Sequence, residues 1–216
     1  MVDLSTNKIK ELTDMPQPRL VKVNLSENEI STAANFSGHP NLNVLELKKN
    51  KLVNCAGIAN MRKLQQLNLS ENEITSVKDM KNLHCLTKLD LSNNKLESFD
   101  NMPDLPALEH LILAGNPIEK DGELVKLKGF SALKSLDMAG CAWADEKGDD
   151  FKKEVLIALE GLKIKTVNGE DLTEDDFADA KEEKANRIAA AKEAAEEAAR
   201  LAAEKAENPD AEGEDE

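Results

Sequence analysis

Histidine, cysteine and clustered carboxylates are the residues of this chain best suited to chemistry, and their spacing supports none. The histidines His39, His84 and His110 are far apart in the sequence and lack metal-ligand spacing. The three cysteines are irregularly spaced and form neither a zinc pattern nor an even disulfide set. The acidic segment 145–150 lacks the order of a calcium loop and its terminal Glu. We therefore expect no metal, no cofactor and no enzyme.

Charge and hydropathy exclude two classes of partner. The chain has 216 residues and a net charge of -14, and residues 170–216 contribute 18 acidic and 6 basic side chains to it. The part before residue 170 is therefore close to neutral and lacks the clustered Lys and Arg that phosphate contacts need. The chain has no apolar run of membrane-spanning length and no signal segment. We expect neither nucleic acid nor membrane as partner, and a reducing cytoplasmic location.

A repeated leucine pattern must position the remaining candidate residues. From Leu83 to Met102 the sequence reads Leu-x-x-Leu-x-x-Leu-x-Leu-x-x-Asn-x-Leu-x-x-Phe-x-x-Met. The second leucine of this pattern recurs every 22 residues from Leu20 to Leu108, and its last copy is Leu133 after a three-residue expansion. This period predicts a solenoid in which each turn supplies one short parallel strand and a return segment. The chain begins within a repeat, so that an open strand edge is expected at Val2–Leu4.

One polar column runs through these repeats and is expected to be structural. Its members are Asn7, Asn28, Asn50, Asn72, Asn94, Asn116 and, in the last repeat, Cys141. The turn after each strand leaves backbone groups pointing inward, and a buried Asn amide can donate to one and accept from another. Loss of one such Asn is expected to cost about 1–3 kcal/mol. Cys141 can replace this function only weakly.

Alternation along each strand defines a candidate binding face. Inward residues are aliphatic, and outward residues form a concave face that is polar in its first two thirds and slightly apolar around Ile112, Ala114 and Ala139. The residues expected to bind a partner there are Lys22, Glu46, Lys48, Gln66, Asn68, Lys88, Asp90, His110 and Ile112. His110 with Lys88, Asp90 and Ser135 could imitate part of a catalytic group. Such neighbours arise by chance on any polar sheet, so we expect binding and not catalysis.

The repeats at 1–141 are followed by a predicted cap at 142–172. Trp143 is expected in the core, Phe151–Leu159 has helical spacing, and Leu162–Val167 alternates like a short strand. Asn168-Gly169 indicates a turn. Open solenoids need such a cap to cover their last apolar layer.

An Ala/Glu-rich helix is predicted at 173–207, followed by a disordered acidic end at 208–216. The helix is expected to carry ion pairs Glu183–Arg187 and Glu196–Arg200. Its large apolar residues are few, namely Phe177, Ile188 and Leu201. Because these cannot form a core of their own, we expect the helix to dock on a partner protein, for example in a coiled coil.

These repeats resemble the 22-residue class of intracellular leucine-rich repeats, known from a regulatory subunit of protein phosphatase 1 and from axonemal proteins. The resemblance covers residues 1–172. The segment Leu111-Ile-Leu113-Ala-Gly-Asn116-Pro-Ile118 is similar to the last repeats of that class, and Phe151 to Asp171 is similar to its cap. The family usually has Tyr-Arg where this chain has Phe151-Lys152, and Pro where it has Gly161. The resemblance implies an α/β leucine-rich repeat solenoid with a C-terminal cap.

Three kinds of relative share parts of this arrangement. Radial-spoke leucine-rich repeat proteins are similar in having repeats, this cap and then a charged helix. The axonemal dynein light chain shares the repeats but has its own N-terminal helix. Acidic nuclear phosphoproteins share the repeats but have nearly unbroken acidic tails. The first resemblance implies a non-catalytic subunit of a large ciliary or flagellar assembly. A nuclear protein, a phosphatase regulator or a dynein-associated chain are the alternatives.

Overall fold

The computed structural model describes residues 1–120 and 122–207, without the side chains of 204–207. The acidic end predicted at 208–216 lies outside the described residues. The chain divides into two compact units, of which the first is Met1–Thr173 and the second begins at Glu174. The first unit holds the repeats and the segment that closes them, and the second is one long helix within the described residues.

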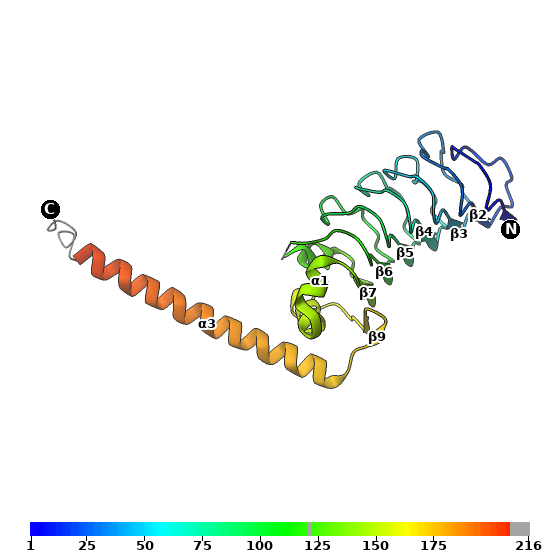
Figure 1. Ribbon diagram of the computed structural model, residues 1–216. Helices are drawn as coiled ribbons and strands as arrows, with labels where there is room; N and C mark the ends of the chain where they lie inside the picture. Colours follow the sequence, from blue (N-terminus) through cyan, green and yellow to red (C-terminus); the bar gives the residue numbers. More distant parts are fainter. Residues whose placement is uncertain (121, 208–216) are drawn as a thin grey trace, which may run out of the picture. The chain divides into compact units, whose positions relative to one another are not determined.

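Nine short strands of the first unit form one sheet in chain order, which confirms the predicted solenoid (Figure 1). Strands β1 to β8 are parallel because each repeat returns by the same path, and the last strand is antiparallel to β8. The strands are β1 (Val2–Asp3), β2 (Lys22–Asn24), β3 (Val44–Glu46), β4 (Gln66–Asn68), β5 (Lys88–Asp90), β6 (His110–Ile112), β7 (Ser135–Asp137), β8 (Thr166–Val167) and β9 (Glu170–Asp171).

Aliphatic side chains stacked in layers form the core of this unit. In each strand from β2 to β7 the central residue is buried, and its two neighbours are half-buried or exposed on the other side of the sheet. Leu67 of β4 and Leu69 just after it are both buried, for example, while Gln66 is exposed. Burial of each such side chain stabilises the fold by about 1.5–3 kcal/mol.

Five asparagines, each in the turn that follows a strand, join successive repeats by hydrogen bonds. The amide nitrogen of Asn72 donates to the carbonyls of Leu69 in its own turn and Leu47 in the preceding one, at 2.9 and 3.0 Å. Its amide oxygen accepts from the backbone N–H of Leu52 at 3.0 Å. The same pattern of donation and acceptance holds at Asn28, Asn50, Asn94 and Asn116. Each amide therefore joins two neighbouring repeats.

The two ends of this column differ from its middle. Asn7 is exposed, and its amide nitrogen donates to Leu4 and Ser5 in its own turn, since no described repeat precedes it. Asn7 is therefore not the buried stitch that the pattern predicted. Cys141 is buried, and its thiol donates to the carbonyl of Leu113 at 3.4 Å, so it supplies one weak bond in place of the amide's set.

The repeat that is lengthened by three residues contains a 3₁₀ helix at Glu123–Gly129. Glu123 is buried there, and its carboxylate accepts from the backbone N–H of Phe99 at 2.6 Å and from Lys126 at 2.6 Å. Lys126 also pairs with Asp100 at 2.8 Å. The carboxylate thus gives a hydrogen-bond acceptor to a backbone group that the irregular turn would otherwise leave unpaired.

Two helices and a hairpin close the solenoid. The predicted helix is α2 (Phe151–Ala158), and a further helix, α1 (Ala142–Lys147), was not predicted. Trp143 is buried as expected and meets Phe151 edge-on, with ring centroids 5.5 Å apart. The strand predicted from Leu162 begins only at Thr166.

Asn168-Gly169 forms the predicted turn between β8 and β9, with φ of 50° and 79°. The Asn168 side chain has a second function that the sequence did not reveal. Its amide oxygen accepts from the backbone N–H of Met138 at 2.8 Å. In the preceding repeats that bond is made to a backbone carbonyl of the next strand, as from Leu113 to Asp137. Asn168 therefore ends the series of backbone hydrogen bonds between successive repeats.

The second unit contains α3 (Glu174–Glu207), which confirms the predicted long helix. Glu183 and Arg187 form the expected ion pair at 2.7 Å. Glu196 lies 3.9 Å from Lys192, on the turn before the expected partner Arg200. All side chains from residue 185 to 203 are exposed.

Candidate partner-binding face

The outward residues of the strands lie in straight columns on the concave face. The first column holds one residue from each of β2 to β7, and the hydrogen-bonded register aligns the second column in the same way. Neighbours within a column are about 4.8 Å apart, and the two columns are about 6.6 Å apart along each strand. The first column is Lys22, Val44, Gln66, Lys88, His110 and Ser135, and the second is Asn24, Glu46, Asn68, Asp90, Ile112 and Asp137.

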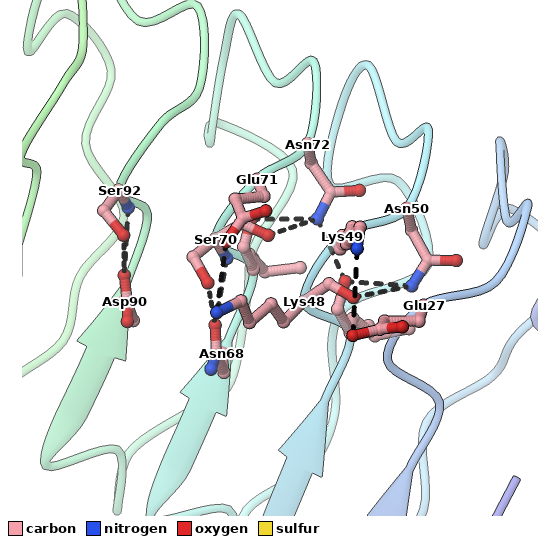
Figure 2. Close-up of polar contacts among 12 residues, drawn as sticks. Glu27, Lys48, Lys49, Asn50, Asn68, Ser70, Glu71, Asn72, Asp90 and Ser92 are labelled. Atoms are coloured by element: carbon pink, nitrogen blue, oxygen red, sulfur yellow. Dashed lines mark hydrogen bonds and ion pairs between the residues drawn. The ribbon is translucent and has the colours of Figure 1, made fainter. Parts of the chain in front are cut away.

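Most of the second column is partly engaged in its own turns. The side-chain oxygen of Asn68 accepts from both the N–H and the hydroxyl of Ser70, at 3.0 and 2.7 Å. Asp90 makes the same two bonds to Ser92, as Figure 2 shows. Each residue thus keeps one polar group for a partner, namely the amide nitrogen of Asn68 and the second carboxylate oxygen of Asp90. These turns were missed, although Asn/Asp-Leu-Ser recurs in the sequence and is typical of them.

Glu46 differs from its neighbours in this column. It has one methylene more than Asp, and within the described chain its carboxylate makes no hydrogen bond or ion pair. The side chains of Gln66 and Lys88, in the adjacent column, are likewise unbonded among the described residues and are exposed. Three polar side chains on neighbouring strands are therefore uncommitted.

Lys48 is engaged within the chain. Its ammonium group lies 3.1 Å from the carboxylate of Glu71, and Figure 2 shows the side chain extending from the turn after β3 to the neighbouring turn of Asn68 and Ser70. This hydrogen bond with Glu71 raises the pKa of Lys48, with smaller contributions from more distant carboxylates such as Asp90. Lys48 therefore borders the uncommitted group and is less available to a partner than its sequence position predicts.

The uncommitted side chains surround a shallow hollow over β3, β4 and β5. Its volume is about 70 Å³, which is enough for a few water molecules or the end of one side chain. Its lining consists of Glu46, Gln66, Leu67, Asn68, Lys88 and Asp90. Five of these residues belong to the set that the sequence nominated, which the fold brings together in one place.

The last third of the face is smoother. Ile112 and Ala114 are half-buried, and Ala139 is exposed. Gly115 follows Ala114 with φ of 69°, and a Cβ there would lie 2.4 Å from the amide oxygen of Asn93. A side chain at that position would strain the backbone and displace the Asn93 amide, so this end of the face exposes backbone and small side chains.

The fold does not assemble the histidine constellation into a catalytic group. His110 is exposed on β6, and the hydroxyl of Ser135 accepts from the hydroxyl of Thr166 at 2.7 Å. Asp90 is bonded to Ser92, and the described residues include no hydrogen bond between His110 and either group. Within residues 1–120 and 122–207, no set of His, Cys, Asp and Glu is placed to hold a metal ion.

Two of the other residues suited to chemistry, Cys55 and His39, have structural positions. Cys55 is buried, and that burial raises the pKa of its thiol to about 12, so the reactive thiolate is absent at neutral pH. Cys85 is exposed. The ring of His39 is buried and bonds to the carbonyl of Gln17 at 3.0 Å, as expected of a structural residue.

The nominated residues of α3 lie on more than one side of the helix. Phe177, Ile188 and Leu201 are 45%, 59% and 49% exposed. At about 100° per residue, Phe177 and Ile188 are about 20° apart around the axis, whereas Leu201 is about 140° from Ile188. A single partner surface can therefore cover the first two together but not the third. No helix among the described residues has the length and apolarity needed to span a bilayer.

Comparisons with known proteins agree with the repeat pattern. Residues 62–104 match the family model described as "Leucine Rich repeats (2 copies)". The crystal structure of internalin C2 from Listeria monocytogenes is similar at 21% identity with a TM-score of 0.59, over 82% of this chain and 76% of that one. An internalin (inlF) from the same bacterium is similar at 17% identity and 0.52, over 79% and 54%. At such identities the likeness shows the fold alone. No curated protein matches the chain.

Proposed function

We propose that this chain is a leucine-rich repeat protein that acts as a non-catalytic scaffold and binds a partner protein on its concave face. The observation that carries this proposal is the hollow over β3 to β5, where Glu46, Gln66 and Lys88 are uncommitted. Every buried side-chain nitrogen and oxygen of the described residues has a hydrogen-bond partner, so these unbonded groups belong to the surface. Leucine-rich repeat solenoids generally use such curved, extended faces to bind other proteins.

The second unit supports a second contact. Helix α3 exposes Phe177 and Ile188 on one side, and partner-dependent helices typically bury such a line in a groove. We propose that this helix docks on another protein of the same assembly. The polar, mixed-charge character of the concave face and the sparse apolar residues of α3 fit reversible contacts within a large assembly better than an obligate apolar interface.

The finer proposal is that the assembly belongs to a cilium or flagellum, such as the radial spoke. Its support is the sequence resemblance of repeats, cap and charged helix to axonemal leucine-rich repeat proteins. Fluorescent tagging of the full chain tests it. Signal along the axoneme is the expected result. Nuclear signal without a cilium would replace it with the acidic phosphoprotein alternative, and copurified phosphatase activity would favour the phosphatase regulator.

Affinity capture with matched variants tests the scaffold function itself. The full chain is compared with Glu46→Lys/Asp90→Lys, which reverses charge in the hollow, and with Asp137→Lys, which reverses it in the same column outside the hollow. The partner should be retained by the chain and by Asp137→Lys and lost from the double variant. Equal capture by all three would exclude the hollow from binding. Circular dichroism must show that the variants are folded.

A further inference from the structure

The hollow of the concave face has a lining that selects the charge of its occupant. Two carboxylates, from Glu46 and Asp90, lie on either side of Asn68 and are aligned with it in the register of β3, β4 and β5. They are separated by two strand spacings, or about 9.6 Å between backbones. The lining has one ammonium group, from Lys88, so the hollow has a net negative charge.

The groups around the hollow leave specific atoms available to hydrogen-bond an occupant. One oxygen of Asp90 is bonded to Ser92, so that the other oxygen remains as an acceptor. Asn68 is held in the same way by Ser70. The carboxylate of Glu46 has both oxygens unbonded among the described residues, and its longer side chain can lean toward the strand between them.

We propose that this hollow binds an arginine side chain of the partner protein. A guanidinium group has five N–H donors in a planar fork and can reach two carboxylates at once. An ammonium group has three donors around one point and is more strongly hydrated, so it fits two separated acceptors less well. Leu67 at the base of the hollow is buried between its neighbours and leaves a flat strand surface below the planar group.

Other occupants fit the lining less well. A metal ion would need a third ligand of the His, Cys, Asp or Glu type, and the described residues provide no such group. A phosphate or carboxylate would meet two negative side chains for one positive one. This inference rests on the proposed function, because it names the chemistry of the protein partner at the same face.

Lys88 adds a prediction of opposite sign to the inference. It has no ion pair among the described residues and lies in the adjacent column, one strand position before Leu89 and two before Asp90. Its charge repels a lone guanidinium group but attracts an acidic residue beside the arginine. Removal of Lys88 therefore has the opposite effect on an arginine probe to removal of the carboxylates.

Titration of the isotope-labelled full chain with short blocked Gly/Ser peptides, followed by NMR, tests the inference. One peptide has a single central Arg, and the others have Lys or Glu in its place. The side-chain amide signals of Gln66 and Asn68 report on the hollow directly. The Arg peptide should shift both signals, the Lys peptide should bind about threefold more weakly, and the Glu peptide should leave them unchanged.

Variants separate the hollow from general attraction to an acidic protein. Glu46→Gln/Asp90→Asn should weaken binding of the Arg peptide about tenfold, since each exposed charge pair contributes up to about fivefold. Lys88→Ala should strengthen it about twofold. Asp137→Asn is the matched control, because Asp137 also bonds the backbone two residues later but lies outside the hollow. It should bind like the unmodified chain.

Three results would overturn the inference. The Arg peptide could bind Glu46→Gln/Asp90→Asn and the unmodified chain with equal affinity, it could shift only NMR signals away from the hollow, or it could shift no signal at millimolar concentration. Any of these results combined with charge-dependent capture of the partner would leave the proposed scaffold function standing with a different contact. If the peptide test fails and capture of the partner is also independent of charge at the hollow, the concave face has no role in binding.

Discussion

The two units of this chain are built on opposite principles. In Met1–Thr173 a core of buried aliphatic side chains runs through the repeats, and the asparagine column satisfies inward backbone groups. In α3 all three large apolar side chains are exposed, and the helix contains good helix formers with i,i+4 ion pairs. The first unit is stabilised by contacts between repeats, whereas residues 185–203 of the second are exposed and depend on local helix propensity. Only the first unit therefore presents a binding surface whose shape is fixed by a packed core.

The largest expected effect contrasts two apolar side chains. Leu89→Ala removes a buried side chain of β5 and should lower the free energy of unfolding by about 2–5 kcal/mol. Ile188→Ala removes a side chain that is 59% exposed and should change the urea unfolding midpoint of the first unit very little. A comparable loss in both variants would show that α3 is part of the same cooperative core.

The asparagine column allows a comparison within the first unit. Asn72→Ala leaves the Leu52 N–H without a partner and removes one of the two amide donors from each of the Leu47 and Leu69 carbonyls, and should cost about 1–3 kcal/mol. Asn7→Ala affects only exposed bonds within one turn and should cost less than about 0.5 kcal/mol. Chemical denaturation measures both, and equal costs would contradict the role of the column as a stitch between repeats.

Acid should affect the first unit through its carboxylates. Hydrogen bonds from Lys95 to Glu73 and from Lys134 to Glu109 hold the pKa of each carboxyl below its ordinary value of 4.5. Because these pKa values are lower in the folded state, the stability they contribute is present above about pH 4.5. It is lost as the pH falls through the folded values.

Thermal unfolding of the first unit between pH 6 and pH 3 measures this effect. Both carboxylates are at the surface, so the contribution is small and screened by salt. Glu73→Gln/Glu109→Gln should make the pH dependence shallower than in the unmodified chain. An unchanged slope would mean that other groups cause the acid sensitivity.

The smallest effect is expected in α3. Arg187→Ala removes the ion pair with Glu183, worth about 0.2–0.5 kcal/mol in an exposed helix. Amide exchange in the surrounding turns should become faster by a factor of about two or less. A much larger change would show that this pair contacts something beyond its own helix.

The sequence predicted the parts of the molecule that follow from periodicity. The 22-residue step places Leu67 and Leu69 in the core and aligns Glu46, Asn68 and Asp90 on one face, because stacked turns have a fixed register. The buried amide bonds follow from the same logic, since a regular turn leaves the same backbone groups unpaired in each repeat.

The missed features lie where periodicity stops or where side chains choose among several partners. Glu123 lies in the lengthened repeat and accepts a hydrogen bond from the Phe99 N–H. The separation of these two residues along the chain does not follow from the 22-residue period. Asn168 was interpreted only as a turn residue, although it also ends the ladder at Met138. The pairing of Lys48 with Glu71, rather than with a carboxylate of its own face, depends on side-chain geometry. That pairing determines which residues are left to line the hollow.

Photo-crosslinking from three positions tests the central claim most directly. Benzoylphenylalanine replaces Gln66 in the hollow, Val53 as an exposed residue outside the strands, or Ile188 on α3. The account predicts that the Gln66 position crosslinks to one partner protein and that Val53 does not, while Ile188 crosslinks to a different protein or to none. Crosslinking of the main partner from Val53 or Ile188, with none from Gln66, would contradict the account.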